Sequence, residues 1–213
     1  MVGPSRAALV FVHGLWMTGV ESALLRRRLA RERGYATRVF HYRSLRAPMS
    51  AHITALRDFI ASIDAPRVHL VGHSLGGLVI LRYLERYPMR QPGRVVFLGP
   101  PLLGSQAARH IGRWSWGRGI LGVTAADELL GTLQRRWSAE RELGIIAGSS
   151  SLGLARMLVR FREDNDGVIA VSETRLPGAK DHLLLPASHS GMLLSARVAR
   201  ETGSFLENGS FSR

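Results

Sequence analysis

The segment Gly72-His73-Ser74-Leu75-Gly76 follows the pattern Gly-x-Ser-x-Gly. A short apolar run over 68–71 precedes it, and a helical pattern that starts near Gly77 follows it. Between a strand and a helix this pattern forms a tight turn, in which the glycines avoid collisions and the serine hydroxyl projects above the sheet. We therefore predict that Ser74 is a nucleophile and that the backbone amide of Leu75 donates to a developing oxyanion.

A serine hydroxyl needs a base that takes its proton, and the predicted base is His189. In such a strand–turn–helix arrangement an acid and then a histidine follow the serine along the chain. Five of the eight histidines precede Ser74, and His110 precedes the acidic residues that come after the later strands. His182 begins a predicted strand at the wrong edge of a parallel sheet, whereas His189 lies in the loop after that strand.

The acid that orients His189 is predicted to be Asp166, in the turn Asp164-Asn165-Asp166-Gly167. A carboxylate at this point would hold the imidazole in the required tautomer and stabilise the imidazolium. Asp, Asn and Gly are also ordinary turn residues, so the cluster has a second interpretation without catalysis. The alternative acids are Asp164, and then Glu163, Glu173 and Asp181.

The loop after the first apolar run, His13-Gly14-Leu15-Trp16, is expected to supply the second amide of an oxyanion hole. Gly14 lets the backbone turn toward Ser74, which makes Leu15 the predicted donor and Trp16 the alternative. We expect the His13 ring to fix this loop rather than to take part in the chemistry. The Trp16 side chain is predicted to line a substrate pocket, and ordinary packing is the alternative.

Short apolar runs alternate with helical patterns, which predicts one α/β domain over residues 1–213. The expected architecture is a three-layer α/β/α sandwich around a mostly parallel sheet of about six strands. The predicted strands cover 7–12, 37–42, 67–71, 94–98, 143–147 and 182–185. The predicted helices cover 21–33, 52–63, 78–87, 152–161 and 192–205.

Residues 102–141 interrupt this alternation and contain many glycines and three of the four tryptophans. Apolar side chains together with helix-weakening glycines favour a small mobile cap over the site. In that interpretation Trp114 and Trp116 line the substrate pocket. The alternative interpretation is a rigid pair of core helices.

The 213 residues carry 29 Lys and Arg against 16 Asp and Glu, a net charge of +13, and Lys180 is the only lysine. The arginines are spread along the chain, which indicates compositional bias and argues against a nucleic-acid interface. The charge leaves open a weak association with anionic lipid surfaces.

The chain has no cysteine, which excludes disulfides, cysteine metal sites and thiol catalysis. It has no Gly-Lys phosphate-binding loop, no His-Glu-x-x-His and no dinucleotide motif after the first strand, so we expect no cofactor and no metal. Because no signal-peptide pattern or membrane-length apolar stretch stands out, a cytoplasmic location is expected.

The motifs together resemble those of the α/β-hydrolase superfamily. The matching segments are 12–15, 72–76, 165–167 and 188–190, and 99–101 and 104–105 resemble a segment of compact bacterial lipase- and esterase-like members. The resemblance implies hydrolysis of small acyl esters without a cofactor. It assigns catalytic roles to Ser74, Asp166 and His189, and oxyanion roles to Leu15 and Leu75.

The resemblance also implies a minimal version of that fold. The first apolar run is similar to the third strand of larger members, which gives a strand order of 2-1-3-4-5-6 along this chain. The insert over 102–141 is too short for a large lid. An acyltransferase or a thioesterase would share the same triad, and a non-catalytic binding protein on a hydrolase scaffold is a third interpretation.

Overall fold

The structure is a computed structural model that describes residues 7–131, 135–151 and 161–213. Its centre is a six-stranded sheet in the order β2-β1-β3-β4-β5-β6, in which every neighbouring pair is parallel. The strands are β1 (Ala8–Val12), β2 (Ala36–Phe40), β3 (Val68–His73), β4 (Val95–Leu98), β5 (Leu143–Gly148) and β6 (Asp181–Leu185). The predicted fold class and strand order are confirmed.

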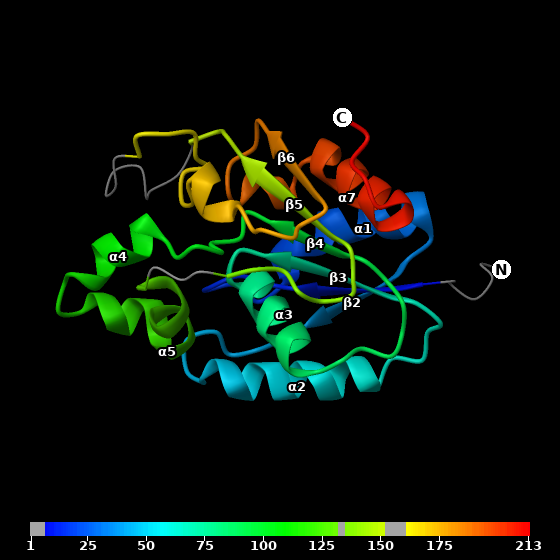
Figure 1. Ribbon diagram of the computed structural model, residues 1–213, viewed down its shortest axis with the longest axis horizontal. Coiled ribbons are helices and arrows are strands. Elements are labelled where there is room, and N and C mark those ends of the chain that lie inside the picture. Colours follow the sequence, from blue (N-terminus) through cyan, green and yellow to red (C-terminus); the bar gives the residue numbers. More distant parts are fainter. Residues whose placement is uncertain (1–6, 132–134, 152–160) are drawn as a thin grey trace.

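Helices cover both faces of this sheet, and for that reason β1, β3, β4 and β5 are buried along their whole length. On one face lie α2 (Met49–Ala61) and α3 (Leu75–Arg86), and on the other lie α1 (Ala23–Arg33) and α7 (Ala196–Asn208) (Figure 1). Each face has its own apolar core, with Leu56 and Leu78 in the first and Leu29 and Phe205 in the second. The described residues also contain short 3₁₀ turns at Val20–Ser22, Val171–Thr174 and Gly191–Leu193.

Local sequence signals set the helix ends. α1 ends at Gly34, which adopts a left-handed φ of 68°. α3 ends before Tyr87, whose backbone is extended because Pro88 follows. α7 begins after Ser195, whose hydroxyl accepts a hydrogen bond of 3.3 Å from the Val198 amide. That cap divides the predicted helix over 192–205 into a short turn and α7.

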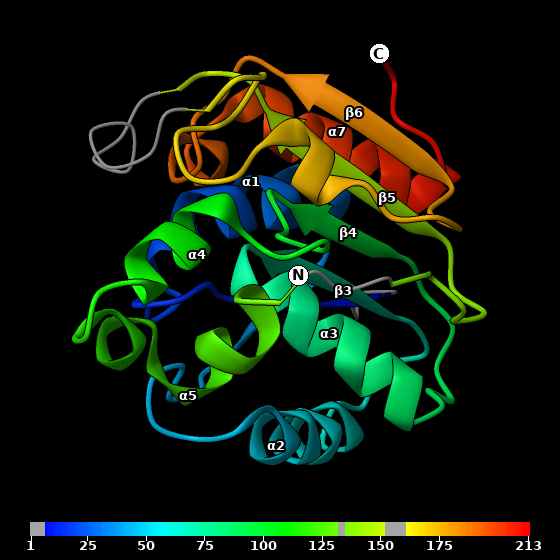
Figure 2. The ribbon, with the colours of Figure 1, turned by 60° about the vertical axis from the view of Figure 1, so that its left-hand side comes forward.

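The insert over 102–141 contains α4 (Gln106–Gly112) and α5 (Gly117–Leu129), which lie beyond one end of the sheet (Figures 1 and 2). α5 is broken at Gly122, where φ is 71° and ψ is 173°. After this break, Ala125 and Leu129 belong to the same apolar core as α3. Trp137 is buried in that core too, with its ring 5.9 Å from the Phe97 ring. This part of the insert is core structure, as in the alternative interpretation.

The strand boundaries differ from the predicted ones by no more than two residues at either end. The predicted helix over 152–161 lies almost wholly outside the described residues. Within the described parts of the chain, no helix is both long enough and apolar enough to span a bilayer.

Candidate active site

Ser74 lies at the tight turn between β3 and α3. Its backbone is held at φ 54° and ψ −124°, a conformation that a non-glycine residue rarely adopts, and its amide donates to the Leu98 carbonyl at 2.9 Å. A side chain at Gly76 would collide with the Val12 carbonyl, so a glycine is required for α3 to pack this close to β1. The turn presents the hydroxyl at the carboxyl edge of the sheet, beside the amino end of α3.

Asp166 and His189 form a buried pair at the same edge. His189 Nδ1 donates to Asp166 Oδ2 at 2.6 Å, and the His189 amide donates to the Asp166 carbonyl at 2.9 Å. Because a carboxylate only accepts, the proton lies on Nδ1, and Nε2 keeps the lone pair that a base needs. In the described structure the Ser74 hydroxyl makes no hydrogen bond to this ring, but both side chains line one cavity. Such bonds often form only when substrate is bound.

The second oxygen of Asp166 is bound by its own loop. Oδ1 accepts from the amides of Val168 at 2.9 Å and Ile169 at 2.7 Å. The Asp166 amide donates in turn to the Ile169 carbonyl at 3.1 Å. These bonds stabilise the ionised carboxylate and fix its orientation toward His189.

The alternative acids lie elsewhere. Asp164 is exposed and its carbonyl accepts from Val171, while the Glu163 carboxylate binds Ser172. Asp181 binds the amide of Phe211 at the opposite edge of the sheet. Glu173 is buried and accepts from the amides of Ala170 and Gln106 at 2.9 and 2.5 Å. None of these four carboxylates is bonded to His189 in the described residues.

The His13 side chain fixes the loop after β1. Its Nδ1 donates to the Gly14 carbonyl at 2.9 Å, and its Nε2 accepts from the Tyr42 amide at 3.4 Å. The Tyr42 ring stacks on the imidazole at 4.4 Å, and the Tyr42 hydroxyl donates to the His13 carbonyl at 2.9 Å. The Gly14 carbonyl and the Leu15 amide belong to one peptide unit, so these contacts orient the predicted oxyanion donor.

The amides of Leu15 and Leu75 both lie in residues that line the cavity, and neither has a protein acceptor among the described residues. This is the state in which an amide can donate to a substrate oxygen. The alternative donor, Trp16, has a left-handed φ of 59°. Its indole Nε1 donates to the Ile120 carbonyl of α5 at 3.0 Å, so the loop after β1 contacts the insert.

Two positioning residues were not identified from the sequence. His73 is fully buried beside Ser74, and its Nε2 donates to the His189 carbonyl at 2.9 Å. Burial, and then the nearby His189 ring, lower the pKa of His73 to about 3, so it stays neutral beside His189. Gly99 has a φ of 55°, and a Cβ there would stand 2.9 Å from Asp166 Oδ2 and 3.1 Å from His189 Nδ1.

The sequence signals for these two residues are weak because their roles depend on distant contacts. His73 adjoins Ser74 in the motif, but its partner His189 lies 116 positions later. Gly99 follows β4 and makes room for a pair that comes from two later loops.

The cavity at Ser74 has a volume of about 230 Å³ and is mostly apolar. From the insert it receives Ser105, Ala107, Ala108, Ile111, Leu121 and Leu129. Trp16 lines it together with Leu15 and Met17. None of the described residues that line it is Asp, Glu, Lys or Arg.

Trp114 and Trp116 do not line this cavity. They are 54% and 55% exposed, and their rings lie 5.6 Å apart in the turn between α4 and α5. Their prediction as pocket residues is wrong for this geometry, because the short α4 and the Gly117 turn carry them outward, while Ile111 and Leu121 face Ser74.

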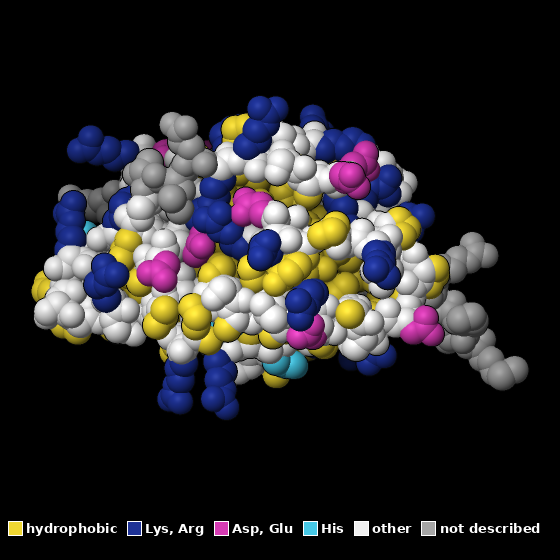
Figure 3. Space-filling model, turned by 60° about the horizontal axis from the view of Figure 1, so that its bottom comes forward, with side chains coloured by type: hydrophobic (Ala, Val, Ile, Leu, Met, Phe, Trp, Pro, Cys, Tyr) yellow, Lys and Arg dark blue, Asp and Glu magenta, His cyan; other side chains and the backbone are white. Residues whose placement is uncertain are grey.

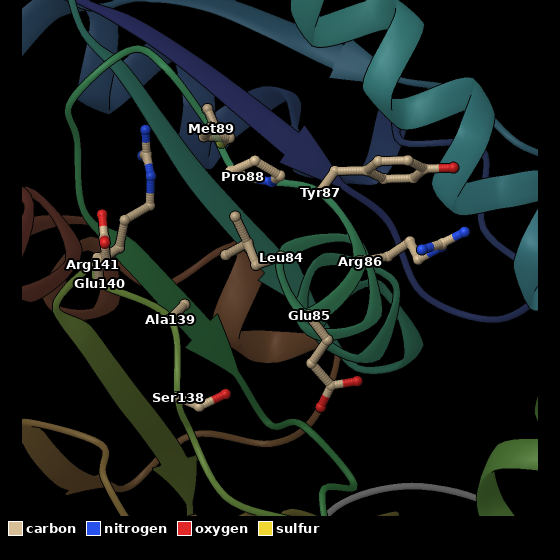
Figure 4. A pocket seen from close by; sticks show the side chains of 10 residues that line it. All are labelled: Leu84, Glu85, Arg86, Tyr87, Pro88, Met89, Ser138, Ala139, Glu140 and Arg141. Carbon is tan, nitrogen blue, oxygen red and sulfur yellow. The ribbon is translucent and has the colours of Figure 1, made fainter.

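A second hollow of about 310 Å³ lies at the far end of α3 from Ser74. In Figure 4 the side chains of Arg86 and Tyr87 point away from Glu140 and Arg141. Catalytic and binding sites need polar groups that converge on one point. The Ser74 cavity combines a hollow with such groups.

Comparison with known proteins agrees with this geometry. The sequence profile of the "Alpha/beta hydrolase family" matches residues 9–194. A comparison with curated protein sequences gives no match.

Solved structures with a similar fold include the mature Bacillus licheniformis lipase BlEst2, with a TM-score of 0.68, 19% identity and coverage of 98% of this chain and 94% of that chain. The metagenomic carboxyl esterase MGS0156 has a TM-score of 0.64 at 19% identity, over 88% of this chain and 65% of that one. The Bacillus subtilis carboxylesterase CesB has a TM-score of 0.61 at 14% identity, over 98% and 86%. With a family match over most of its length and the same fold, this chain belongs to the alpha/beta hydrolase family.

Proposed function

We propose that this protein is a serine hydrolase that cleaves carboxylic esters through an acyl-enzyme intermediate. The observation that carries the proposal is a single cavity lined by Ser74, by the Asp166-bonded His189 and by the unpaired amides of Leu15 and Leu75. Similar structures whose names include lipase and carboxylesterase give the proposal further support.

In the proposed reaction, Ser74 Oγ attacks the ester carbonyl carbon while His189 Nε2 takes the hydroxyl proton. The Leu15 and Leu75 amides donate to the carbonyl oxygen as it becomes negative. Breakage of the C–O bond releases an alcohol, which receives the proton from His189, and leaves the acyl group on Ser74. A water molecule then attacks the acyl carbon while His189 Nε2 takes its proton. The bond between the acyl carbon and Ser74 Oγ breaks, the proton passes from His189 to Oγ, and the carboxylic acid leaves.

The proposed substrate has a neutral, apolar acyl group. The chain carries a net charge of +13, yet no charged residue appears in the described lining of the cavity. A charged acyl group would lose its hydration there without a partner, whereas each buried CH₂ gains about 0.8 kcal/mol. The volume of about 230 Å³ favours an acyl chain of modest length over a bulky one.

The test is Ser74→Ala against a panel of nitrophenyl esters from acetate to decanoate. We expect kcat/KM to fall by about a thousandfold or more, and labelling by a fluorophosphonate probe to disappear. Ser190→Ala is the matched control, because Ser190 lines the same cavity but lies outside the tight turn. Unchanged turnover and labelling in Ser74→Ala would refute the proposal, and added glycerol with product analysis separates hydrolysis from acyl transfer.

A further inference from the structure

Large exposed apolar side chains are concentrated at one end of the molecule. Seven of the ten in the described residues lie in the loop after β1, the loop after β2 or the α4–α5 insert. These seven are Trp16, Val20, Leu45, Trp114, Trp116, Ile120 and Val123. Exposed apolar residues that are scattered singly need no explanation, whereas a concentration marks a surface that another body covers.

Contacts within this end join its central residues into one surface, which we call the aromatic rim: Trp16, Trp114, Trp116 and Ile120. The Trp16 indole donates to the Ile120 carbonyl at 3.0 Å, the Ile120 amide donates to the Trp116 carbonyl at 3.3 Å, and the rings of Trp114 and Trp116 lie 5.6 Å apart. Trp16 also lines the Ser74 cavity, as does Leu121, the neighbour of Ile120. The rim therefore borders the mouth of the cavity.

Unpaired arginines accompany the rim. Arg113 and Arg118 flank the two tryptophans in sequence, and Arg43 and Arg46 lie in the loop after β2 that contacts α5. All four are exposed, and none forms an ion pair within the described residues. The sequence has no Asp or Glu over 33–57 or over 86–126. Figure 3 shows Lys and Arg side chains that project around apolar surface at the α4–α5 end.

Tryptophan and arginine together fit the boundary of a charged bilayer. Indole rings settle at the headgroup level, and each arginine near an anionic surface contributes about 1 kcal/mol. Nucleic acid or an acidic protein would satisfy the arginines. It would leave the aliphatic side chains of Ile120, Leu45 and Val123 without an apolar partner, which hydrocarbon supplies.

We propose that the aromatic rim docks this protein on membrane surfaces that contain anionic phospholipids. Docking in this orientation places the mouth of the Ser74 cavity against the lipid. The consequence that a membrane ester is the substrate rests on the proposed function, whereas the docking itself does not involve the Ser74 hydroxyl.

The test is sedimentation with vesicles of phosphatidylcholine, alone or mixed with phosphatidylglycerol, using the Ser74→Ala protein so that no lipid is cleaved. We expect binding only to the mixed vesicles, weakened by salt and accompanied by a blue shift of tryptophan fluorescence. The double variants Trp114→Ala/Trp116→Ala and Arg113→Gln/Arg118→Gln should each bind about tenfold more weakly or worse. The matched control is Arg27→Gln/Arg31→Gln, with the same charge change on α1.

Equal binding of the rim variants and the α1 control would overturn the proposal, as would binding to duplex DNA or polyglutamate in preference to the mixed vesicles. Melting temperatures confirm that each variant is folded. If wild-type protein hydrolyses soluble esters but does not bind the mixed vesicles, the docking proposal is wrong and the proposed function stands. Protein that binds the mixed vesicles but cleaves no ester supports the docking and removes the proposed function.

Discussion

The two sides of the Ser74 cavity are built differently. On one side, Asp166 and His189 are buried, and four backbone amides and two imidazole bonds hold them in place. On the other side, α4 and α5 present only apolar and small side chains, on a helix broken at Gly122. The side with the proposed chemistry is therefore held in place by hydrogen bonds. The proposed substrate side offers only its shape and its apolar side chains for recognition.

The same division runs through α5 itself. After Gly122, the Val123 amide donates to the Leu45 carbonyl at 3.2 Å, and the buried Thr124 hydroxyl is bonded to Ala47 and His52. Before Gly122, Leu121 is buried in the same apolar core as Ala125, whereas Ile120 is exposed and its carbonyl accepts from the Trp16 indole. The second half of α5 is therefore held by directional bonds as well as by packing, and the first half by apolar packing and one contact to the loop after β1.

The largest expected effect is on the Asp166 side. Asp166→Asn should lower kcat by about a thousandfold or more, because an amide nitrogen facing His189 Nδ1 stabilises the wrong tautomer. Asp164→Asn, two residues away and exposed, should change kcat less than about threefold. Steady-state kinetics on a short-chain ester compares them. Equal losses of kcat in the two variants would contradict the prediction that Asp166 specifically orients His189.

A smaller effect is expected where α5 is anchored to α3. Arg135 is buried and bonded to the Glu128 carboxylate, which also accepts from Arg82 at 3.1 Å. Glu128→Gln leaves the Arg135 charge without its counter-ion and should cost about 3 kcal/mol of unfolding free energy, measured by urea denaturation. Arg82→Gln, at the exposed end, should cost less than about 1 kcal/mol. The reverse order would show that the buried pair is not the anchor.

Acid should destabilise the whole fold through its buried neutral histidines. Burial lowers the pKa of His69 to about 4 and of His73 to about 3, and it also lowers the pKa values of His13, His52 and His182. Below about pH 6.5 the unfolded chain takes up protons that the folded chain refuses, so the unfolding free energy falls as pH falls. Each histidine contributes up to about 1.4 kcal/mol per pH unit across its own window.

Urea midpoints from pH 7.5 downward measure this slope. His69→Gln should make it shallower, because an amide can still accept from the Arg94 amide but does not titrate. A flat profile between pH 7 and pH 5 would contradict the prediction.

The smallest effect concerns the shape of the substrate side. Ala107 is buried and lines the cavity, so Ala107→Leu fills space that an acyl chain would use. We expect kcat/KM for decanoate esters to fall about tenfold relative to acetate esters, because the buried end of the longer chain is displaced. Trp114→Ala is the control, since its ring lies outside the cavity, and chain-length preference should stay unchanged. A change of chain-length preference in Trp114→Ala alone would indicate that the acyl chain binds near Trp114 and not beside Ala107.

Much of this arrangement could be predicted from local patterns. The turn around Ser74 has its strand before it and its helix after it, and each of the strands β1, β3, β4 and β5 is a short apolar run that is buried on both faces. Chain order together with its place after the last strand singled out His189, and the turn at 164–167 nominated Asp166. These predictions depend on residues that are close together in the sequence, and a sequence pattern can capture such local relations.

The positions that were predicted wrongly or not at all depend on contacts between distant residues. Trp114, Trp116 and Trp137 look alike in an apolar, glycine-rich segment, yet the first two are exposed and the third packs on Phe97. Gly99 and His73 matter only because loops from the last third of the chain come to rest against them. No periodicity in the sequence contains that information.

Under the proposed function, the strand order determines which strands must be folded before the protein can be active. Ser74 follows a central strand, β3, whereas His189 follows β6, which is an edge strand two places further on than β4. No fragment with fewer than four adjacent strands can contain both residues in register. On the proposed function, a proteolytic nick or local melting at β6 would abolish activity while Ser74 stayed intact on its turn. Turnover during refolding therefore reports completion of the whole second half of the sheet, not the formation of its centre.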